Sequence, residues 1–396
     1  MGPDTTPTET TATGATLAET TPPTPTRRLR TFAVVGAIVI ALLAAAIVTW
    51  RVTAERDRAA ALGIAQQDEA FSDLPPRLEL PDLVQDLPAD RGVGLAALLY
   101  YSSQDAYDPS TRTFKQYDVY LVTRSGEQFR VGRTPAGTGP LDIVLSPDGR
   151  WLASKRGGTW RVRDVSGTAE YEVPGGSELW LWSTDARSLV LATFSGSDRA
   201  LSIMALPSGT IRPIAVSTSE DAFEVAFIAG RQLAVFTPSM DAFTTGRPVS
   251  VTLHDVETGA TRDLRVVSSD QLQPGETAGT FFGIFRVGGN PPSIWAEVGR
   301  PDLLPTDSPE GAITAPSVAL VGVNVATGAP SARIELAVAN GFPAELCRGV
   351  VAEGVVLQRW TKTTTDLIVV EPDSNTRRVV TSFPGTVMVV VPGSRV

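Results

Sequence analysis

Short runs of alternating apolar and polar residues, separated by turn-forming residues, recur through most of the chain. The stretch from Ile143 to Gly167 reads IVLSPDGRWLASKRGGTWRVRDVSG. It alternates three times, breaking first at Pro-Asp-Gly and then at Gly-Gly. Alternation with a period of two is typical of a half-buried strand, and Gly, Pro and Asp favour tight turns. The pattern therefore predicts three short strands joined by two tight turns.

The third strand of this unit occurs six times, each time with the turn that follows it. The copies are YDVYLVTRSG, TWRVRDVSG, LSIMALPSG, VTLHDVETG, VALVGVNVATG and TDLIVVEPDSN. Their turn residues are Gly126, Gly167, Gly209, Gly259, Gly328 and Asn375, which lie 41 to 69 residues apart. The first two strands recur as well, so that Asp185 in WSTDARSLVLA takes the place of Asp148 in LSPDGRWLAS. The sequence is therefore an array of repeats, each with four predicted strands.

An array of four-stranded repeats predicts an all-β fold, the β-propeller. One such sheet cannot cover both of its apolar faces, whereas blades packed in a ring cover one another and leave only short edges. The repeats predict six blades over residues 92–396. Seven blades stay open as an alternative, because 69 residues separate Gly259 from Gly328. We assign that excess to an inserted loop, VGRPDLLPTDSPEGAITAPS, which is rich in turn formers.

The two ends of the array predict how the ring closes. The first repeat has strands of the second, third and fourth type but no convincing first strand, and the chain ends in VMVVVPGSRV, which echoes LDIVLSPDGRW. We therefore expect residues 386–392 to supply the missing strand beside residues 96–101.

Two of these motifs resemble known propeller families. SPDGRWLA looks like the strand-turn-strand motif of TolB-type propellers, and VTLHDVETG is similar to the third strand of WD-repeat blades, where Trp usually stands in place of His254. The chain lacks the Gly-His pair and most of the Trp-Asp pairs of WD repeats. The resemblance covers most of residues 92–396 and implies a bacterial propeller; the excess of arginine over lysine is typical of a GC-rich, for example actinobacterial, genome. It implies no particular activity, because propellers carry many functions.

The N-terminal part of the chain predicts a membrane anchor. Residues 1–31 are rich in Thr and Pro and are expected to be disordered. Residues 32–50, FAVVGAIVIALLAAAIVTW, carry no charge over a length that spans a bilayer as a helix. A cleaved signal peptide is the alternative, although its apolar region is usually shorter. Residues 51–91 read as a helical stalk followed by a proline-rich linker.

The orientation of this anchor in the membrane is inferred from what is usual for bacterial proteins of this kind. Arginines flank both of its ends equally, at 27, 28 and 30 and at 51, 56 and 58, so the positive-inside rule does not decide. Most bacterial proteins with one anchor, a short tail and a large C-terminal domain export that domain. We therefore expect a single-pass protein of the cytoplasmic membrane with an extracytoplasmic propeller.

Candidate chemistry is sparse. The net charge of −9, without a basic cluster in the body of the chain, argues against nucleic acid as a partner. His254 is the only histidine and Cys347 the only cysteine, so a disulfide within the chain is excluded, and a Ser-His-Asp arrangement lacks its nucleophile elbow. GRTPAGTG, from Gly132, has the glycine spacing of a phosphate loop without its lysine and reads as a turn between blades. Asp148 and Asp185 fall in turns, where Asp caps its own backbone. We predict no catalytic, cofactor-binding or metal-binding residue, and no cofactor.

The sequence thus favours a non-enzymatic binding scaffold for an envelope protein or a cell-wall glycan. A carboxylate-dependent enzyme acting on glycans or peptides is one alternative, and a transmembrane sensor with a phosphorylatable cytoplasmic tail is another. Function concentrates on loops held by rigid scaffolds, so we expect the inserted loop around residues 299–316 to bind the partner. It mixes apolar with acidic residues, as interfaces do. The candidate partner-binding residues are Asp302, Leu303, Leu304, Asp307 and Glu310.

Overall fold

The computed structural model describes residues 70–80, 84–102, 107–108, 113–115, 117–134, 143–195, 198–218, 224–228, 231–236, 249–278, 285–289, 292–303, 315–331, 333–339 and 342–394. All of them belong to one compact unit, Gln67–Val396. Within these residues, no helix is both long and apolar enough to cross a bilayer. The predicted tail, residues 1–31, and the predicted anchor, residues 32–50, lie outside the described residues.

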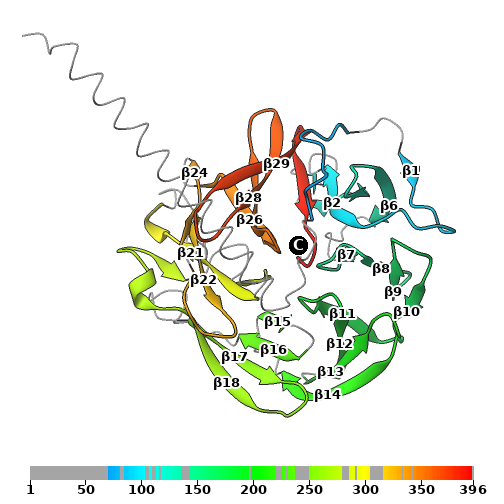
Figure 1. The fold of residues 1–396 in the computed structure, drawn as a ribbon, viewed down its shortest axis with the longest axis horizontal. Coiled ribbons are helices and arrows are strands. Elements are labelled where there is room, and N and C mark those ends of the chain that lie inside the picture. Colours follow the sequence, from blue (N-terminus) through cyan, green and yellow to red (C-terminus); the bar gives the residue numbers. More distant parts are fainter. Residues whose placement is uncertain are drawn as a thin grey trace, which may run out of the picture. The chain divides into compact units, whose positions relative to one another are not determined.

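Six sheets, each with four antiparallel blade strands, stand in a ring as the blades of a propeller (Figure 1), which confirms the predicted fold and the blade count of six. From the centre outward, blade 1 contains β30 (Val387–Val390), β2 (Ala96–Ser102), β5 (Tyr117–Thr123) and β6 (Gln128–Thr134). Blade 2 contains β7 (Ile143–Leu145), β8 (Trp151–Arg156), β9 (Thr159–Asp164) and β10 (Glu170–Glu172). Blade 3 contains β11 (Ser177–Trp182), β12 (Ser188–Ser195), β13 (Asp198–Ala205) and β14 (Ile211–Thr218). Blade 4 contains β15 (Glu224–Ile228), β16 (Gln232–Phe236), β17 (Val249–Asp255) and β18 (Thr261–Val267). Blade 5 contains β20 (Phe285–Gly288), β21 (Ser293–Gly299), β22 (Ser317–Asn324) and β23 (Ile334–Glu335). Blade 6 contains β26 (Glu345–Val351), β27 (Gly354–Trp360), β28 (Thr364–Val370) and β29 (Arg377–Pro384).

Short elements outside the four blade strands complete the described secondary structure. They are β1 (Gln85–Asp86), β3 (Tyr107–Asp108) with β4 (Thr113–Phe114), the 3-10 helices η2 (Ser269–Gln271) and η3 (Pro301–Leu303), β19 (Thr277–Ala278), and β24 (Val338–Ala339) with β25 (Phe342–Pro343). β19 and β20 both pair with β21. The extra length of blade 5 is therefore divided between the segment leading into β20 and the predicted loop between β21 and β22.

The repeated turn residues occupy equivalent places, between the third and fourth strands of their blades. Gly259 has a φ of +72° and Asn375 a φ of +53°. Glycine adopts this left-handed region without a steric penalty, and Asn tolerates it better than most other residues. The chemistry of the turn therefore explains why the repeats could be aligned on these positions.

The ring closes as predicted, through a strand from the end of the chain. β30 pairs antiparallel with β2, with Leu99 opposite Val390 and Ser102 opposite Val387. On the side of β30 that faces blade 6, the fully buried amide of Gln358 replaces a strand neighbour. Its Nε2 donates to the carbonyl oxygen of Val387 at 2.7 Å, and its Oε1 accepts from the backbone N–H of Val389 at 3.1 Å.

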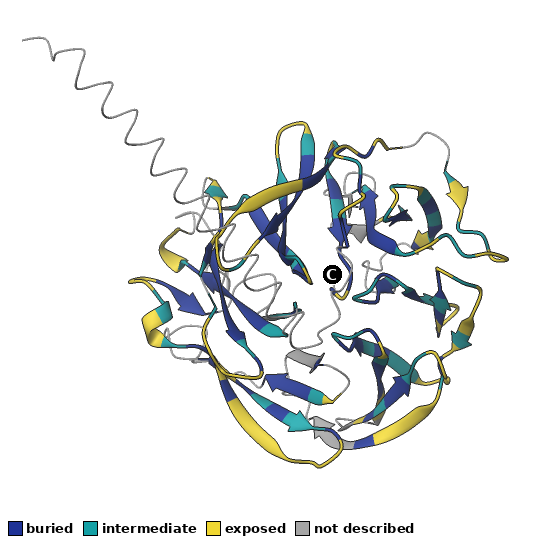
Figure 2. Ribbon diagram, viewed as in Figure 1, coloured by how far each residue is buried: buried dark blue, intermediate teal, exposed yellow. Residues whose placement is uncertain are grey.

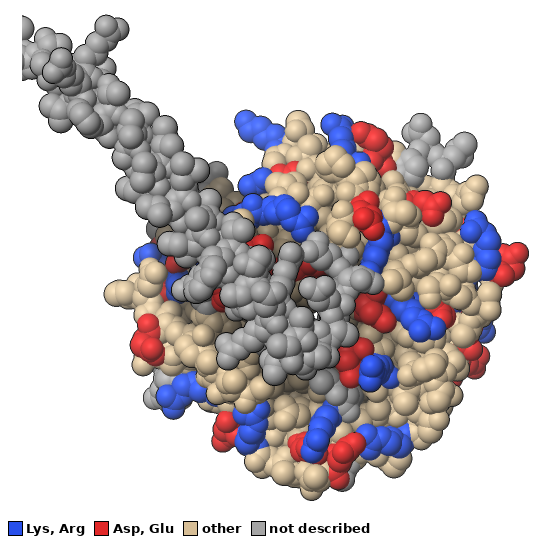
Figure 3. All heavy atoms as spheres, in the orientation of Figure 1, with Lys and Arg blue, Asp and Glu red and all other residues tan. Residues whose placement is uncertain are grey.

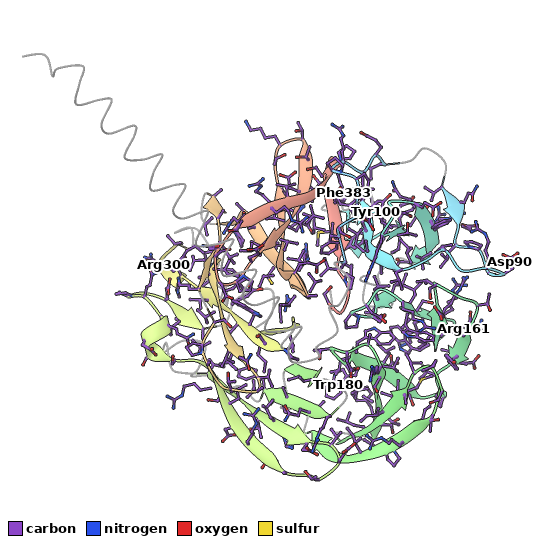
Figure 4. All side chains as sticks on the ribbon, in the orientation of Figure 1. Asp90, Tyr100, Arg161, Trp180, Arg300 and Phe383 are labelled. Carbon is purple, nitrogen blue, oxygen red and sulfur yellow. The ribbon has the colours of Figure 1, made fainter. Side chains whose placement is uncertain are left out.

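The core lies between the blades, where the strands are buried along most of their length, while outer strand edges and turns are exposed (Figure 2). At the junction of blades 6 and 1, the rings of Phe383 and Tyr100 lie 5.2 Å apart (Figure 4). Phe71 and Leu78, which precede the repeats, are buried in the same cluster. β1 also pairs in parallel with β6 as an outer strand of blade 1. The segment from residue 70 onward thus packs on blades 6 and 1.

Candidate functional site

The strand order gives the ring two faces of different character. Because neighbouring strands within a blade are antiparallel, the turns after the first and the third strand lie on one face, which we call the turn face. The connections after the second strand, and those leading to the next blade, lie on the opposite face, which we call the long-loop face. The four longest connections, 103–116, 237–248, 268–284 and 300–316, all join strand ends on that face.

Side chains rigidify the turn face. In the turn of blade 2, Asp148 Oδ1 accepts hydrogen bonds from Ser146 Oγ at 2.6 Å and from the Arg150 N–H at 3.0 Å. Asp185 accepts the same hydrogen bond from Ser183 in blade 3, also at 2.6 Å. Both aspartates therefore cap their own turns, as expected from the sequence. This use of the carboxylate accounts for both residues structurally.

Both ends of the described chain also meet the turn face. The N–H of Phe71 donates to Glu353 in the turn between β26 and β27, at 3.3 Å. Near the other end, the N–H of Gly393 donates to the carbonyl oxygen of Leu145 at 2.9 Å. The long-loop face is consequently the face that carries neither end of the described part.

The inner strands of blades 5 and 6 carry a polar cluster near the long-loop face. Arg286 Nη2 lies 3.9 Å from Glu297 Oε1, and the hydroxyl of Ser317 donates to Glu297 Oε2 at 2.6 Å. On β26, Arg348 Nε donates to Gln358 Oε1 at 2.7 Å. Burial lowers the pKa of Arg348 to about 10, so that the guanidinium remains charged at neutral pH. Among the described residues, this cluster holds two arginines and a single carboxylate, Glu297.

Each buried carboxylate of the described residues is paired with an arginine. The pairs are Asp164–Arg150 at 2.7 Å, Glu276–Arg333 at 2.6 Å, Glu297–Arg286 at 3.9 Å, Glu345–Arg377 at 2.7 Å and Asp366–Arg359 at 2.9 Å. A glycosidase needs two carboxyl groups in different protonation states flanking one bond. An arginine beside a carboxylate favours its ionised form, which is unsuited to a general acid. These five buried carboxylates are thus arranged as structural ion pairs.

The single histidine and the single cysteine of the chain were also considered as a base and a nucleophile. His254 is half-buried on β17, and burial lowers its pKa below the ordinary value. Cys347 is buried on β26, where burial raises the pKa of its thiol to about 12. Within the described part of the chain, no three His, Cys, Asp or Glu residues are grouped so that they could hold a metal ion.

The structure describes two of the five predicted partner-binding residues, and both lie on the long-loop face. Asp302 and Leu303 belong to η3, directly after β21, and Leu303 is 37% exposed. Arg300 Nε donates to Asp302 Oδ1 at 3.0 Å, which fixes this acidic residue at the base of the loop. Leu304, Asp307 and Glu310 lie outside the described residues.

A cleft lies between blades 1 and 2, at the ends of their strands on the long-loop face, and the sequence did not predict it. Residues of β6, β7 and β8 line it, and Arg156 Nη2 donates to the carbonyl oxygen of Val131 at 3.2 Å. The only local signal was the paired basic residues at the end of ASKR, because the two strands meet only in the folded ring.

Comparison with known proteins leaves the activity open. No protein-family model matches the chain, and no curated protein matches it. Solved structures do resemble it. TolB from Acinetobacter baumannii is 14% identical with a TM-score of 0.44, over 74% of this chain and 66% of that one.

The chain is a six-bladed β-propeller. Two enzyme structures share features of this fold. An oligogalacturonate lyase from Vibrio parahaemolyticus is 10% identical with a TM-score of 0.37, over 75% of this chain and 80% of that one. Oligopeptidase B from Leishmania major is 11% identical with a TM-score of 0.36, over 67% of this chain and 37% of that one. The neighbours thus include enzymes as well as TolB, and at these identities the likeness concerns the fold alone.

Proposed function

We propose that the protein is a non-enzymatic binding scaffold, held outside the cytoplasmic membrane by residues 32–50, whose long-loop face binds an envelope protein or a cell-wall glycan. The observation that carries the proposal is the contrast between the two faces: the four longest connections leave one face, and the described chain enters and ends at the other. Loops on a rigid scaffold are the usual site of recognition.

The pairing of each buried carboxylate of the described residues with an arginine supports binding over hydrolysis. A carboxylate paired with an arginine holds the neighbouring strands in place. The base of the predicted loop is also fixed, because the N–H of Arg300 donates to the carbonyl oxygen of Pro316 at 3.1 Å. A loop held at its base loses less entropy when a partner binds.

Site-specific photo-cross-linking in intact cells tests the proposal. A cross-linking amino acid at Leu303 should capture a discrete partner, whereas the same amino acid at Glu257, an exposed turn-face position, should capture none. Replacement of residues 304–314 by a short Gly-Ser linker should abolish capture at Leu303 while leaving the fold intact, as judged by circular dichroism. Equal capture at both positions would contradict the role of the long-loop face. Turnover of a glycan or peptide by the purified protein would overturn the non-enzymatic proposal.

Reporter fusions test the membrane topology separately. A C-terminal alkaline phosphatase, which is active only outside the cytoplasm, should be active, and a fluorescent protein that folds only inside should stay dark. The reverse result would contradict the proposed orientation. A mature N-terminus found near residue 46 would instead identify a cleaved signal peptide.

A further inference from the structure

The innermost strands of two blades each carry one extra residue, a β-bulge. In blade 3 the register of β11 on β12 shifts at Trp180. In blade 6 the register of β26 on β27 shifts at Arg348. Within the described residues, the other four innermost strands, β7, β15, β20 and β30, pair with their second strands without such a shift. A bulge changes the direction of a side chain, and bulges are frequent next to functional sites.

The two bulges occupy matching positions in the ring. Blades 3 and 6 lie opposite each other among the six blades (Figure 1). Trp180 (Figure 4) is the fourth residue of β11 and Arg348 is the fourth residue of β26, so both side chains start from a similar depth. Both residues are half-buried, whereas the residues on either side of each are buried. Because those neighbours fill the spaces between blades, we place Trp180 and Arg348 at the inner edges of their blades, toward the axis of the ring.

The contacts of Arg348 agree with this position. Its Nε donates to Gln358 Oε1 at 2.7 Å, and its Nη2 donates at 3.3 Å to the sulfur of Met388 on the innermost strand of blade 1. Burial lowers the pKa of Arg348 to about 10, and Tyr101 of blade 1 and Arg286 of blade 5 are close enough to act on it electrostatically. A side chain of blade 6 that meets both neighbouring blades lies where the inner edges of the three blades converge.

The charge of Arg348 lacks a carboxylate partner. Within the described residues, no carboxylate oxygen lies within 4.0 Å of its guanidinium. The carboxylate of this cluster, Glu297, lies 3.9 Å from Arg286 and accepts from the hydroxyl of Ser317. On the face shown in Figure 3, in contrast, basic and acidic side chains are interspersed. Arg348 therefore keeps one positive charge, which a ligand with one negative charge would neutralise.

Two half-buried indole rings accompany this charge. The guanidinium carbon of Arg348 lies 5.8 Å from the centroid of the Trp360 ring, and Trp180 comes from the opposite blade. A planar guanidinium offers paired N–H donors that match the two oxygens of a carboxylate. An indole has a flat apolar face and a polar edge. The C–H face of a sugar ring packs on such a surface while its hydroxyl groups stay hydrated, so the residues present fit a sugar that carries a carboxylate.

We propose that the axis of the ring binds an acidic sugar, whose carboxylate pairs with Arg348 and whose ring packs on Trp180. A single carboxylate matches the one uncompensated charge, whereas a phosphate group, with about −1.5 to −2 charges at neutral pH, would exceed it. The site is distinct from the loop around residues 299–316, and the inference holds or fails whether or not that loop binds a partner. A peptide carboxylate is the competing ligand that the experiment separates from the sugar.

Isothermal titration calorimetry on the full-length protein, purified in detergent and held at constant ionic strength, measures the site directly. N-acetylmuramate and glucuronate each carry a carboxylate that their neutral counterparts, N-acetylglucosamine and glucose, lack. At least one of the two acidic sugars should bind about tenfold more tightly than its counterpart, as a charge-assisted hydrogen bond predicts. N-acetyl-alanyl-alanine, a peptide carboxylate without a sugar ring, should bind more weakly than that acidic sugar.

Three variants locate the site. Arg348→Gln should raise the Kd of the acidic sugar about tenfold. Trp180→Leu, which keeps apolar bulk on β11, should raise it about fivefold through the loss of ring packing. The matched control is Arg161→Gln on β9, an exposed arginine paired with Glu170 (Figure 4), which should leave the Kd within about twofold. Unchanged melting temperatures would show that the variants are folded, and Arg348→Lys, with its charge kept and its paired donors lost, replaces Arg348→Gln if that variant does not fold.

Four outcomes would overturn the proposal. It fails if neither acidic sugar binds more tightly than its neutral counterpart, or if the folded variant at Arg348 binds the acidic sugar as well as the parent does. It fails equally if Arg161→Gln weakens binding as much as the variants at the axis do. Tighter binding of N-acetyl-alanyl-alanine than of either acidic sugar would assign the site to a peptide carboxylate instead.

Discussion

The two faces of the propeller are built from the same strands and yet serve different needs. On the turn face, Asp148 and Asp185 cap tight turns, and Phe71 and Gly393 tie both ends of the described chain to the ring. On the long-loop face, the connections vary in length, and the side chains described there include exposed Leu303 and cationic Arg156. The difference teaches that one face holds the ring together while the other is free to diversify. Substitutions on the turn face should therefore cost stability, and those on the long-loop face should cost binding.

Removal of the closing strand should have the largest effect. Deletion of residues 385–396 takes away Val387, Val389 and Val390, each at most 3% exposed, and leaves β2 as an open edge. At about 1.5–3 kcal/mol for each buried valine, the loss should exceed about 5 kcal/mol and lead to aggregation. Urea denaturation measures it, with Val379→Ala, at an exposed valine of β29, as the control. A truncated protein as stable as the parent would show that closure does not depend on β30.

A pair of glycines compares the faces directly. Gly149 on the turn face has a φ of +74°, and a Cβ there would lie 1.9 Å from the carbonyl oxygen of Ala96. Gly157 on the long-loop face has a φ of +59° with nothing within 4 Å. Gly149→Ala should lower the free energy of unfolding by about 3 kcal/mol, and Gly157→Ala by only about 1 kcal/mol. Equal losses in chemical denaturation would remove the distinction between the faces.

The amide of Gln358 should come next in effect. Gln358→Leu leaves the carbonyl oxygen of Val387 and the N–H of Val389 without their side-chain partner in a buried place. The expected loss is about 2 kcal/mol. Thermal unfolding measures it against Gln85→Leu on the exposed strand β1, which should change the melting temperature little. A fall no larger than that of the control would mean that β30 needs no contact from blade 6.

The pH dependence of stability separates a turn-face carboxylate from one on the long-loop face. Burial opposes the ionisation of Asp164, but hydrogen bonds from Arg150 and Ser166 outweigh it and hold its pKa below the ordinary value of 3.8. A carboxyl group with a lower pKa in the folded than in the unfolded state stabilises the fold above the unfolded pKa, and this contribution is lost as the pH falls through the folded pKa.

Asp164→Asn should therefore cost about 1 kcal/mol at pH 7 and flatten the loss of stability below about pH 4. Burial likewise opposes the ionisation of Glu178, and hydrogen bonds from Lys155 and Trp160 lower its pKa in turn. Because its side chain is 43% exposed, Glu178→Gln should have a smaller effect. Denaturation curves between pH 2 and pH 7 compare the two variants, and a larger effect of Glu178→Gln would reverse the expected order.

The smallest effect on stability is expected at the predicted loop. Leu303→Ala removes a side chain that is 37% exposed, so the free energy of unfolding should change by less than about 0.5 kcal/mol. Partner capture, in contrast, should fall if the loop binds as proposed. A large loss of stability, measured by thermal unfolding, would place Leu303 among the residues that hold the ring.

Local patterns determined the strands, the turns and the blades of this protein. The period of two, the turn chemistry of Asp148 and Gly259, and the echo of the first strand in the last residues act over a few neighbours, so they could be read directly. The six blades and the closing strand followed from them. The predicted anchor and the loop residues Leu304, Asp307 and Glu310 remain sequence predictions.

The tertiary structure alone determined the contacts between residues that lie far apart in the chain. Phe71 follows a polar segment and carries no periodic signal, yet it is buried between blades 6 and 1. Glu345 meets Arg377, and Gln358 meets Val387, only because adjacent strands and blades face each other in the ring. The cleft at Arg156 likewise requires two blades at once. A sequence pattern reports the face on which a side chain lies, whereas its partner across the gap is fixed by the packing of the ring.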